Sequence, residues 1–238
     1  MLHVVLAVAL LMTGYVLGSI PFGVLIGKWF WGVDVREHGS GNIGTTNVFR
    51  VLGKRAGTLV LICDMAKGFV PTWIAVQLLP SWLAVLVALV TVLGHTYSVF
   101  LRGGGGKGVA TGAGVILALM WPVFIITVVT WAIVVLVSRM VSLASLTAAL
   151  VFTVATFVFD MPVLYRVLAI LATLVVMWAH RSNIRRIALR CENKVSFPWD
   201  KRSRGSMAGV MGETGDEGRV SEGSAGEAGQ RRDSEERE

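Results

Sequence analysis

The sequence predicts an all-α integral membrane protein with seven transmembrane helices, one of them short, the N-terminus outside and the C-terminus in the cytoplasm. Three observations predict this fold. Hydrophobic residues make up 54% of the 238-residue chain, and its mean hydropathy is +0.68. Several apolar runs approach or exceed the ~20 residues that a helix needs to cross a bilayer. Basic residues gather in alternate connections between these runs, as the positive-inside rule requires.

The apolar runs occupy, in order, residues 2–27, 57–79, 82–101, 109–137, 140–159 and 162–179. The first run has no Lys or Arg before its apolar core, which argues against a cleaved signal peptide. We therefore expect it to be a retained span. The later runs are separated by Pro80-Ser81, Ser138-Arg139 and Asp160-Met161-Pro162.

The run at 109–137 is long for one helix and contains Trp121-Pro122. Proline disfavours helical continuation at the residue before it. If this run were unbroken, Arg139 and the basic cluster after residue 180 would lie outside, whereas a break near Pro122 places both inside. The charge pattern therefore predicts a short fourth helix at 109–120. About 12 residues rise only ~18 Å, so neighbouring helices must shield it.

Charge divides the chain into two predicted regions. Residues 1–198 form a membrane domain with a net charge of +10, and residues 199–238 form a polar tail with a net charge of −3. The tail is rich in Gly, Ser, Glu and Arg, a composition that predicts disorder. The basic membrane domain reflects either the positive-inside rule alone or an anionic substrate. The two cysteines, Cys63 and Cys191, provide no disulfide framework, and no motif indicates a metal site.

The polar segment GSGNIGTTNVFR at residues 39–50 interrupts the apolar pattern. Its glycines let the backbone turn and present N–H groups, and an arginine can hold an oxyanion bidentately. The alternative is a capped helix start, with Thr46 or Asn47 capping a helix that runs to Leu52. Both interpretations can hold together. The candidate anion-binding residues are Ser40, Gly41, Asn42, Thr46, Asn47 and Arg50.

A second polar segment, RGGGGKGVAT, begins at Arg102. It is not a nucleotide-binding P-loop, because Gly108 stands where that motif needs Ser or Thr after the lysine. Backbone N–H groups and Lys107 nevertheless precede a helix, where the helix dipole favours an anion. The alternative is a flexible hinge, which would not need Lys107. The candidate residues are Gly105, Gly106, Lys107 and Gly108.

A third cluster follows the last apolar run. His180, Asn183 and Arg186 recur every three residues, so on a helix they share one flank. The alternative is an ordinary basic helix end with an incidental histidine. Asp64 and Lys67 lie inside the second run, where ionisable residues are functional candidates, unless they only neutralise each other.

With the predicted topology, the three clusters share the cytoplasmic face. Arginine, lysine, histidine, serine, asparagine and backbone N–H groups can bind phosphate without a metal. The main alternative is a small transporter for an organic phosphate, because glycine-interrupted helices suit transporters too. The polar residues gather on one face and no inverted repeat is visible, which favours an enzyme. A structural scaffold would leave the loop chemistry unexplained.

The order and spacing of these segments resemble a known family. The chain resembles the bacterial acyl-phosphate:glycerol-3-phosphate acyltransferases of the PlsY type over about residues 1–195. The matching pieces are GSIPFG at 18–23, GSGNIGTTNVFR at 39–50, DMAKG at 64–68, GGKGVATGAG at 105–114, SLAS at 142–145 and HRSNIRR at 180–186 with Glu192.

The resemblance implies a multi-pass enzyme of the bacterial inner membrane with its active site facing the cytoplasm. It would move a fatty acyl group from acyl phosphate to the 1-hydroxyl of glycerol 3-phosphate, the first step of phospholipid synthesis. Ser40, Arg50 and Lys107 would hold phosphate, and His180 and Asn183 would line the acyl-transfer centre. Arg186 and Glu192 would contact substrate. We expect no cofactor, no nucleic acid and a monomer.

Overall fold

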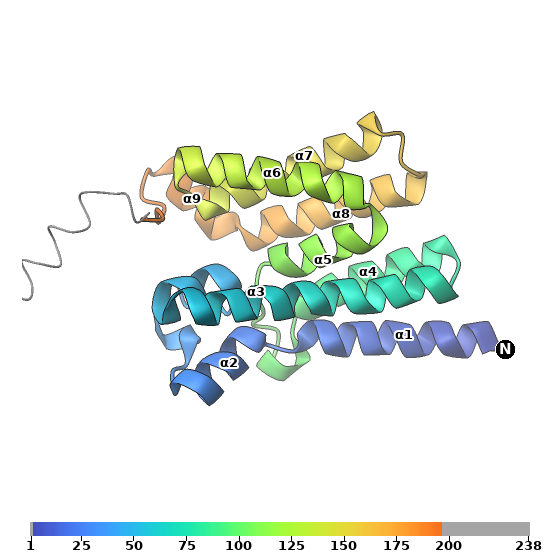
Figure 1. Cartoon of the computed structure of the whole chain (residues 1–238), viewed down its shortest axis with the longest axis horizontal. Helices are drawn as coiled ribbons and strands as arrows, with labels where there is room; N and C mark the ends of the chain where they lie inside the picture. Colours follow the sequence, from blue (N-terminus) through green and yellow to red (C-terminus); the bar gives the residue numbers. More distant parts are fainter. Residues whose placement is uncertain (1, 197–238) are drawn as a thin grey trace, which may run out of the picture. The chain divides into compact units, whose positions relative to one another are not determined.

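The computed structural model describes residues 2–196, and the regular elements in this part of the chain are all helical (Figure 1). The chain up to Val195 forms a compact unit. The predicted tail at 199–238 lies outside the described residues. The helices are α1 (Leu2–Ser19), α2 (Phe22–Trp31), η1 (Val35–Glu37), α3 (Thr45–Leu78), α4 (Ser81–Thr96), η2 (Val99–Leu101), α5 (Val109–Leu119), α6 (Trp121–Ser138), α7 (Val141–Val158), α8 (Val163–Ala179) and α9 (Arg181–Ala188).

Most of these helices are long and apolar enough to cross a membrane. Four segments of the described chain pass this test alone, namely Thr45–Leu78, Ser81–Leu101, Trp121–Ser138 and Val141–Val158. Two bent pairs, α1 with α2 and α8 with α9, raise the number to six if each pair is one span. Helix α5 is apolar but has only 11 residues. It rises about 17 Å and cannot cross a ~30 Å hydrocarbon core alone.

Two of the helix breaks lie at prolines. The break expected near Pro122 is confirmed, because α5 ends at Leu119 and α6 begins at Trp121. The first apolar run is also broken, a bend that the sequence pattern did not predict. Helices α1 and α2 meet at Pro21 and bend by 47°. Proline lacks the N–H that would continue the helical hydrogen bonds.

Small residues bring the helices of the bundle together. Helix α3 packs against α5 and α4, α1 against α4, and α6 and α8 against α7. At Gly68 in α3 an added Cβ would overlap the Thr111 carbonyl oxygen, and at Gly114 in α5 it would overlap the Met65 carbonyl oxygen. The backbones of α3 and α5 therefore touch, as small residues allow in membrane bundles. This contact shields the short helix.

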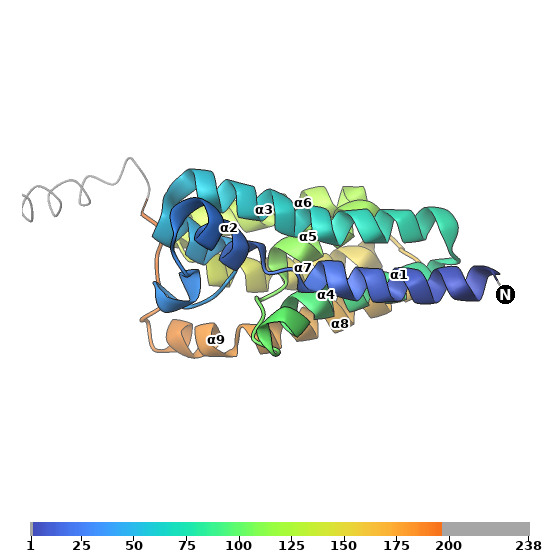
Figure 2. The ribbon, with the colours of Figure 1, turned by 90° about the horizontal axis from the view of Figure 1, so that it is seen from below.

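The connections between the helices lie at two ends of this unit. The α3–α4 turn, the α5–α6 junction and the α7–α8 connection lie at the end where the chain begins (Figure 1). Helix α2, the α6–α7 turn and α9 lie toward the opposite end, which we call the basic end, and the second view agrees (Figure 2). Arg166 lies near the start of α8, away from the basic end, and it pairs with Asp160.

Candidate active site

The segment before α3 folds around the side chain of Asn47, which is 1% exposed. Its Oδ1 accepts from the Ser40 N–H at 2.8 Å, and its Nδ2 donates to the carbonyls of Val35 at 2.9 Å and His38 at 3.1 Å. Both amide donors are thus used inside the protein. We expected Asn47 to contact substrate. In the structure the side chain supports the loop that carries Ser40, and a substrate contact by Asn47 stays a prediction.

Helix α3 begins immediately after this loop. Gly44 is its N-cap, so the alternative in which Thr46 or Asn47 caps the helix is wrong. The end expected at Leu52 is confirmed, because Gly53 has the non-helical angles φ 81° and ψ −171°. The eight residues 45–52 thus form a separate first segment of α3.

The exposed face of this first segment carries two predicted site residues. Thr46 and Arg50 lie four residues apart and are both exposed, so they share a face. Asn42 lies just before the helix and accepts from the Gly44 N–H at 2.8 Å. The helix N-terminus and the guanidinium therefore meet solvent at the same place, where the dipole favours an anion.

The glycine-rich loop is anchored to the end of α4. The Gly105 N–H donates to the Thr96 carbonyl at 3.2 Å, and the Gly106 N–H donates to the His95 carbonyl at 3.0 Å. These two N–H groups are therefore bonded within the protein, and substrate contact by Gly105 and Gly106 stays a prediction. The N–H groups of Lys107 and Gly108 are not taken up by any residue that the structure describes.

Gly108 is the N-cap of α5 and has φ 76°, a backbone conformation that glycine adopts without strain. Lys107 precedes it and lies at the N-terminal end of the helix, as the sequence predicted. Its side chain is half-buried. The glycine therefore turns the chain so that the lysine stands at the positive end of a helix dipole.

The third cluster lies at a sharp bend. Helices α8 and α9 meet at His180 and differ in direction by 63°. His180 is 2% exposed, Asn183 is 3% exposed and Arg186 is half-buried. The flank predicted from the spacing of three residues is thus the buried flank of α9.

The hydrogen bonds of His180 fix its proton. Its Nδ1 lies 2.8 Å from the Val176 carbonyl oxygen. A carbonyl oxygen only accepts, so Nδ1 carries the proton in the neutral ring and Nε2 remains as the acceptor. This tautomer leaves Nε2 unprotonated at the bend, and burial together with the nearby Lys107 holds the pKa of His180 below its ordinary value.

A chain of hydrogen bonds joins the second and third clusters. Lys107 Nζ donates to Asn183 Oδ1 at 2.6 Å. Asn183 Nδ2 lies 2.7 Å from both Ser142 Oγ and Glu192 Oε1, and Ser142 Oγ donates to the same Glu192 oxygen at 2.7 Å. Arg186 Nε donates to Glu192 Oε2 at 2.8 Å. Residues that are 76 positions apart in sequence are thereby brought into contact.

The expectation for Glu192 changes with this geometry. Both of its carboxylate oxygens are bonded to protein groups, namely Ser142, Asn183 and Arg186. The Glu192 side chain is buried, and a carboxylate also repels an anionic substrate. We therefore revise its role from a substrate contact to a support that orients Asn183 and Arg186.

The charges around Lys107 leave the site electropositive. Burial lowers the pKa of Lys107 to about 8; Glu192 opposes this shift, and the cations Arg186 and Arg50 add to it. Burial opposes ionisation of Glu192, yet hydrogen bonds from Ser142, Asn183 and Arg186 hold its pKa below the ordinary value. Three cations thus face one carboxylate. An arriving anion would relieve the repulsion among the cations.

Some of the predicted site residues contact or lie near Lys107 in the structure, and others do not. Arg50 and His180 lie within electrostatic range of Lys107, which is bonded to Asn183. Ser40, Gly41 and Asn42 stand on the neighbouring loop, without a contact to this network among the described residues. The second and third clusters therefore form one site, and Arg50 of the first cluster acts on it electrostatically.

Sequence reasoning missed two residues of this region. Ser142, 8% exposed at the start of α7, bonds to both Asn183 and Glu192. His95 is buried in α4 beneath Gly106. A serine in a small-residue run and a single histidine in an apolar run carry no spacing signal. Within residues 2–196, no group of His, Cys, Asp and Glu side chains is placed to hold a metal.

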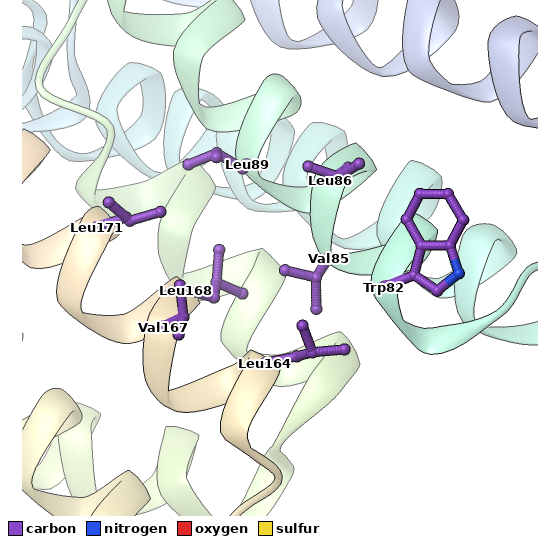
Figure 3. Close-up of a pocket in the computed structure, with 8 residues that line it drawn as sticks. All are labelled: Trp82, Val85, Leu86, Leu89, Leu164, Val167, Leu168 and Leu171. Carbon is purple, nitrogen blue, oxygen red and sulfur yellow. The ribbon is translucent and has the colours of Figure 1, made fainter.

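An apolar groove of about 230 Å³ lies elsewhere, between α4 and α8 (Figure 3). Hydrocarbon side chains and one tryptophan form it, so it offers contact to hydrocarbon and no group that binds phosphate. Its lining residues are Trp82, Val85, Leu86, Leu89, Leu164, Val167, Leu168 and Leu171.

Known proteins are similar to this chain in sequence and in fold. The family described as glycerol-3-phosphate acyltransferase matches residues 8–190. The glycerol-3-phosphate acyltransferase of Myxococcus xanthus is 46% identical over 188 residues, which cover 78% of this chain and 98% of that protein. The enzyme of Geobacillus kaustophilus is 43% identical over 194 residues, covering 82% and 98%.

Solved structures agree with the sequence comparison. The crystal structure of PlsY (YgiH), an integral membrane glycerol 3-phosphate acyltransferase, in its glycerol 3-phosphate form superposes with a TM-score of 0.77 at 42% identity. The matched region covers 80% of this chain and 96% of the PlsY chain. The lysophosphatidic acid form gives a TM-score of 0.76 at the same identity, covering 80% and 95%.

Proposed function

Because the chain belongs to the glycerol-3-phosphate acyltransferase family, we propose that it transfers a fatty acyl group from acyl phosphate to the 1-hydroxyl of glycerol 3-phosphate. The products are lysophosphatidic acid and inorganic phosphate. The chain is an integral membrane acyltransferase, and forms of its solved relative are described with glycerol 3-phosphate and with lysophosphatidic acid. The transporter and scaffold alternatives do not fit this family.

One observation carries the choice of substrates. Lys107, at a helix N-terminus, is bonded to Asn183 and lies within electrostatic range of Arg50 and Arg186. Both proposed substrates carry phosphate, which such a set binds by charge-assisted hydrogen bonds. We therefore assign phosphate binding to Lys107, Arg50 and Ser40. Gly41 and Asn42 of the loop and Thr46 at the start of α3 complete this set, and the N–H groups of Lys107 and Gly108, which no described residue takes up, add donors.

The transfer needs no covalent enzyme intermediate. Acyl phosphate is already an activated mixed anhydride, so the 1-hydroxyl of glycerol 3-phosphate can attack its carbonyl carbon directly. The hydroxyl proton passes to Nε2 of His180 while the new ester C–O bond forms and the bond between the acyl carbon and the phosphate oxygen breaks. His180 then gives this proton to the departing phosphate, which leaves as hydrogen phosphate. Lys107 and its neighbouring N–H groups stabilise the negative charge that develops on the carbonyl and the departing phosphate. Asn183 holds Lys107 and completes the transfer centre.

We also propose a membrane topology. We count α5 as a seventh, short span, so the chain has its N-terminus outside and its basic end in the cytoplasm. The support is the charge distribution, because nearly all described Lys and Arg residues belong to the basic end. The enzyme would then work as a monomer in the bacterial inner membrane, with its site open to cytoplasmic glycerol 3-phosphate.

The activity test compares two acyl donors on the purified chain in detergent. With glycerol 3-phosphate as acceptor, acyl phosphate should give lysophosphatidic acid, and acyl-coenzyme A should neither replace nor compete with it. The matched control is the Lys107→Met variant in the same detergent. Product formed from acyl-coenzyme A alone would contradict the proposed donor. Acyl phosphate consumed without an acyl acceptor would contradict the proposed transfer.

A further inference from the structure

A second charged cluster lies inside the helical bundle, away from the residues assigned to substrate. It consists of Asp64 and Lys67 in α3 and His95 in α4, and all three are buried, with relative exposures of 2%, 6% and 4%. Lys67 Nζ lies 2.8 Å from Asp64 Oδ1, and His95 Nδ1 lies 3.8 Å from the same oxygen. We call these three residues the buried triad.

One arm of the triad reaches the bend of the first span. Lys67 Nζ donates to the Ile20 carbonyl oxygen at 2.7 Å, and its ammonium lies 5.5 Å from the centre of the Phe22 ring. These contacts hold the start of α2. Next to Phe22, a Cβ at Gly23 would overlap the Ile43 carbonyl oxygen, so α2 lies directly against the loop before α3. Lys67 is thus linked through α2 to the loop of Ser40 and Asn42.

The other arm reaches the glycine-rich loop. The His95 carbonyl accepts from the Gly106 N–H at 3.0 Å. The His95 ring occupies the place that a Cβ at Gly106 would take, so the loop backbone rests on this ring. The ring Nδ1 has no hydrogen-bond partner within the described residues, and it faces the Asp64 carboxylate. Lys107 is the next residue along the loop.

We propose that Asp64, Lys67 and His95 are positioning residues that set the two phosphate-binding loops relative to each other. Lys67 fixes the loop at 39–44 through α2, His95 fixes the loop at 103–108, and Asp64 joins the two arms. The inference rests on the proposed function, because that function makes the spacing of the loops matter. A phosphate that must contact both loops binds well at only one separation between them.

A role in stability alone explains the triad less well. Burying an ion pair carries a desolvation penalty that often exceeds its attraction, and well-packed apolar residues of similar size stabilise as much or more. Ionisable groups inside a membrane protein are therefore retained mainly where they serve a function. The triad touches the two elements that precede the loops, which is the placement that a positioning role requires.

The test is steady-state kinetics of the purified full chain with acyl phosphate and glycerol 3-phosphate. The double variant Asp64→Asn with Lys67→Met removes both charges, so no unpaired charge stays buried. A second variant, His95→Gln, leaves the ion pair in place. For each variant we expect the KM for glycerol 3-phosphate to rise about tenfold or more, because displaced loops bind phosphate poorly.

The matched control removes a different buried polar contact between helices. Thr153 and Thr173 join α7 to α8 through their hydroxyls at 2.8 Å, and within the described residues these hydroxyls bond only to groups of the same two helices. Replacing both with Val should leave the KM for glycerol 3-phosphate unchanged. A protein that is merely less well folded loses apparent kcat through a smaller active fraction, and its KM stays the same.

Three outcomes overturn the proposal: an unchanged KM in the triad variants, a fall in kcat alone, or an equal rise in KM in the threonine control. If the neutral double variant fails to fold, His95→Gln decides the question by the same measure. The unmodified chain separates the two ideas. Its failure to transfer acyl groups would overturn the proposed function, whereas normal transfer with unaffected triad variants would overturn only the positioning role.

Discussion

At the scale of single residues, Lys107 joins the sequence pattern to the chemistry. It ends a run of glycines, stands before a helix and is bonded to Asn183 at 2.6 Å. Lys107→Met keeps the apolar stem and removes the charge. One lost charge-assisted contact to a desolvated phosphate should remove about 2–4 kcal/mol of transition-state stabilisation, which lowers kcat/KM about 30- to 1000-fold.

The Arg variant at the same position separates charge from shape. Lys107→Arg should restore part of the activity, because its charge remains while its planar fork reaches differently. Turnover by purified, correctly folded Lys107→Met above half of the normal rate would show that the glycine-rich loop is only a hinge.

The same lysine predicts a pH dependence. Its pKa is lowered from 10.5 to about 8, so the cation is present at pH 7 and is lost as the pH rises through 8. We expect kcat/KM for glycerol 3-phosphate, which reports groups of the free enzyme, to fall about tenfold per pH unit above this point. In Lys107→Arg the guanidinium stays charged, and the fall should move well above pH 10. If kcat/KM falls over the same alkaline pH range in the unmodified chain and in Lys107→Arg, a group other than Lys107 causes the fall.

The sequence predicted which residues gather at the site more readily than it predicted the role of each residue. Lys107, His180 and Asn183 were correctly expected to lie together, because helical spacing and topology alone place them at one end. Asn47 and Glu192 were expected to touch substrate, yet they bond to the protein itself. An amide or carboxylate looks the same in sequence whether it binds a ligand or a loop. The folded contacts alone distinguish the two cases.

At the scale of elements, the short helix α5 depends on its neighbours. Two glycines that lie two residues apart, and so on opposite faces of the helix, make a matched test. A Cβ at Gly114 would overlap the Met65 carbonyl oxygen of α3, whereas a Cβ at Gly112 meets nothing within 4 Å. Gly114→Ala should push α3 and α5 apart and destabilise the protein by about 1–3 kcal/mol. Gly112→Ala should be neutral or stabilise by up to about 1 kcal/mol.

Thermal unfolding of both purified glycine variants in the same detergent checks this expectation. Equal midpoints would show that α3 and α5 do not approach as closely as the structure has them. A lower unfolding temperature for Gly112→Ala than for Gly114→Ala would show that Gly112, not Gly114, faces the neighbouring helix, which contradicts the structure.

The break between α5 and α6 makes a topological prediction. In a chain with Cys63 and Cys191 replaced by Ser, a single cysteine at Trp121→Cys should react with an impermeant thiol reagent from outside the cell. A cysteine at Ser138→Cys should react only after the membrane is opened. Labelling of both positions from the same side would contradict the seven-span topology.

At the element scale, the sequence predicted one of the two helix breaks at prolines and missed the other. The break at Pro122 was predicted because the run was too long and the charges beyond it required another crossing. The bend at Pro21 was missed, because the 2–27 run has the length of one span and no charge depends on it. The positive-inside rule detects a helix break only when the break adds a crossing and so moves the following residues to the other side of the membrane. A bend within one span leaves the side unchanged, so the charge pattern carries no trace of it.

At the scale of the whole molecule, the fold brings three distant polar segments to the basic end of an apolar bundle. The all-helical fold, the short helix and the family followed from composition, charge parity and motifs. Asp64 and Lys67 were functional candidates from their place inside a span, but the parts of His95 and Ser142 did not follow, because they act through contacts between helices far apart in the sequence. The central claim is that this end transfers an acyl group directly from acyl phosphate to glycerol 3-phosphate.

The most direct measurement uses glycerol 3-phosphate labelled with ¹⁸O at its 1-hydroxyl, with acyl phosphate as donor and the purified chain as catalyst. If the hydroxyl attacks the acyl carbonyl, the lysophosphatidic acid formed should retain the label in its ester oxygen. One phosphate should be released for each ester, and an acyl-enzyme should not accumulate during a single turnover. Loss of the label from the ester, or a covalent acyl-enzyme formed before the acceptor is added, would contradict the account.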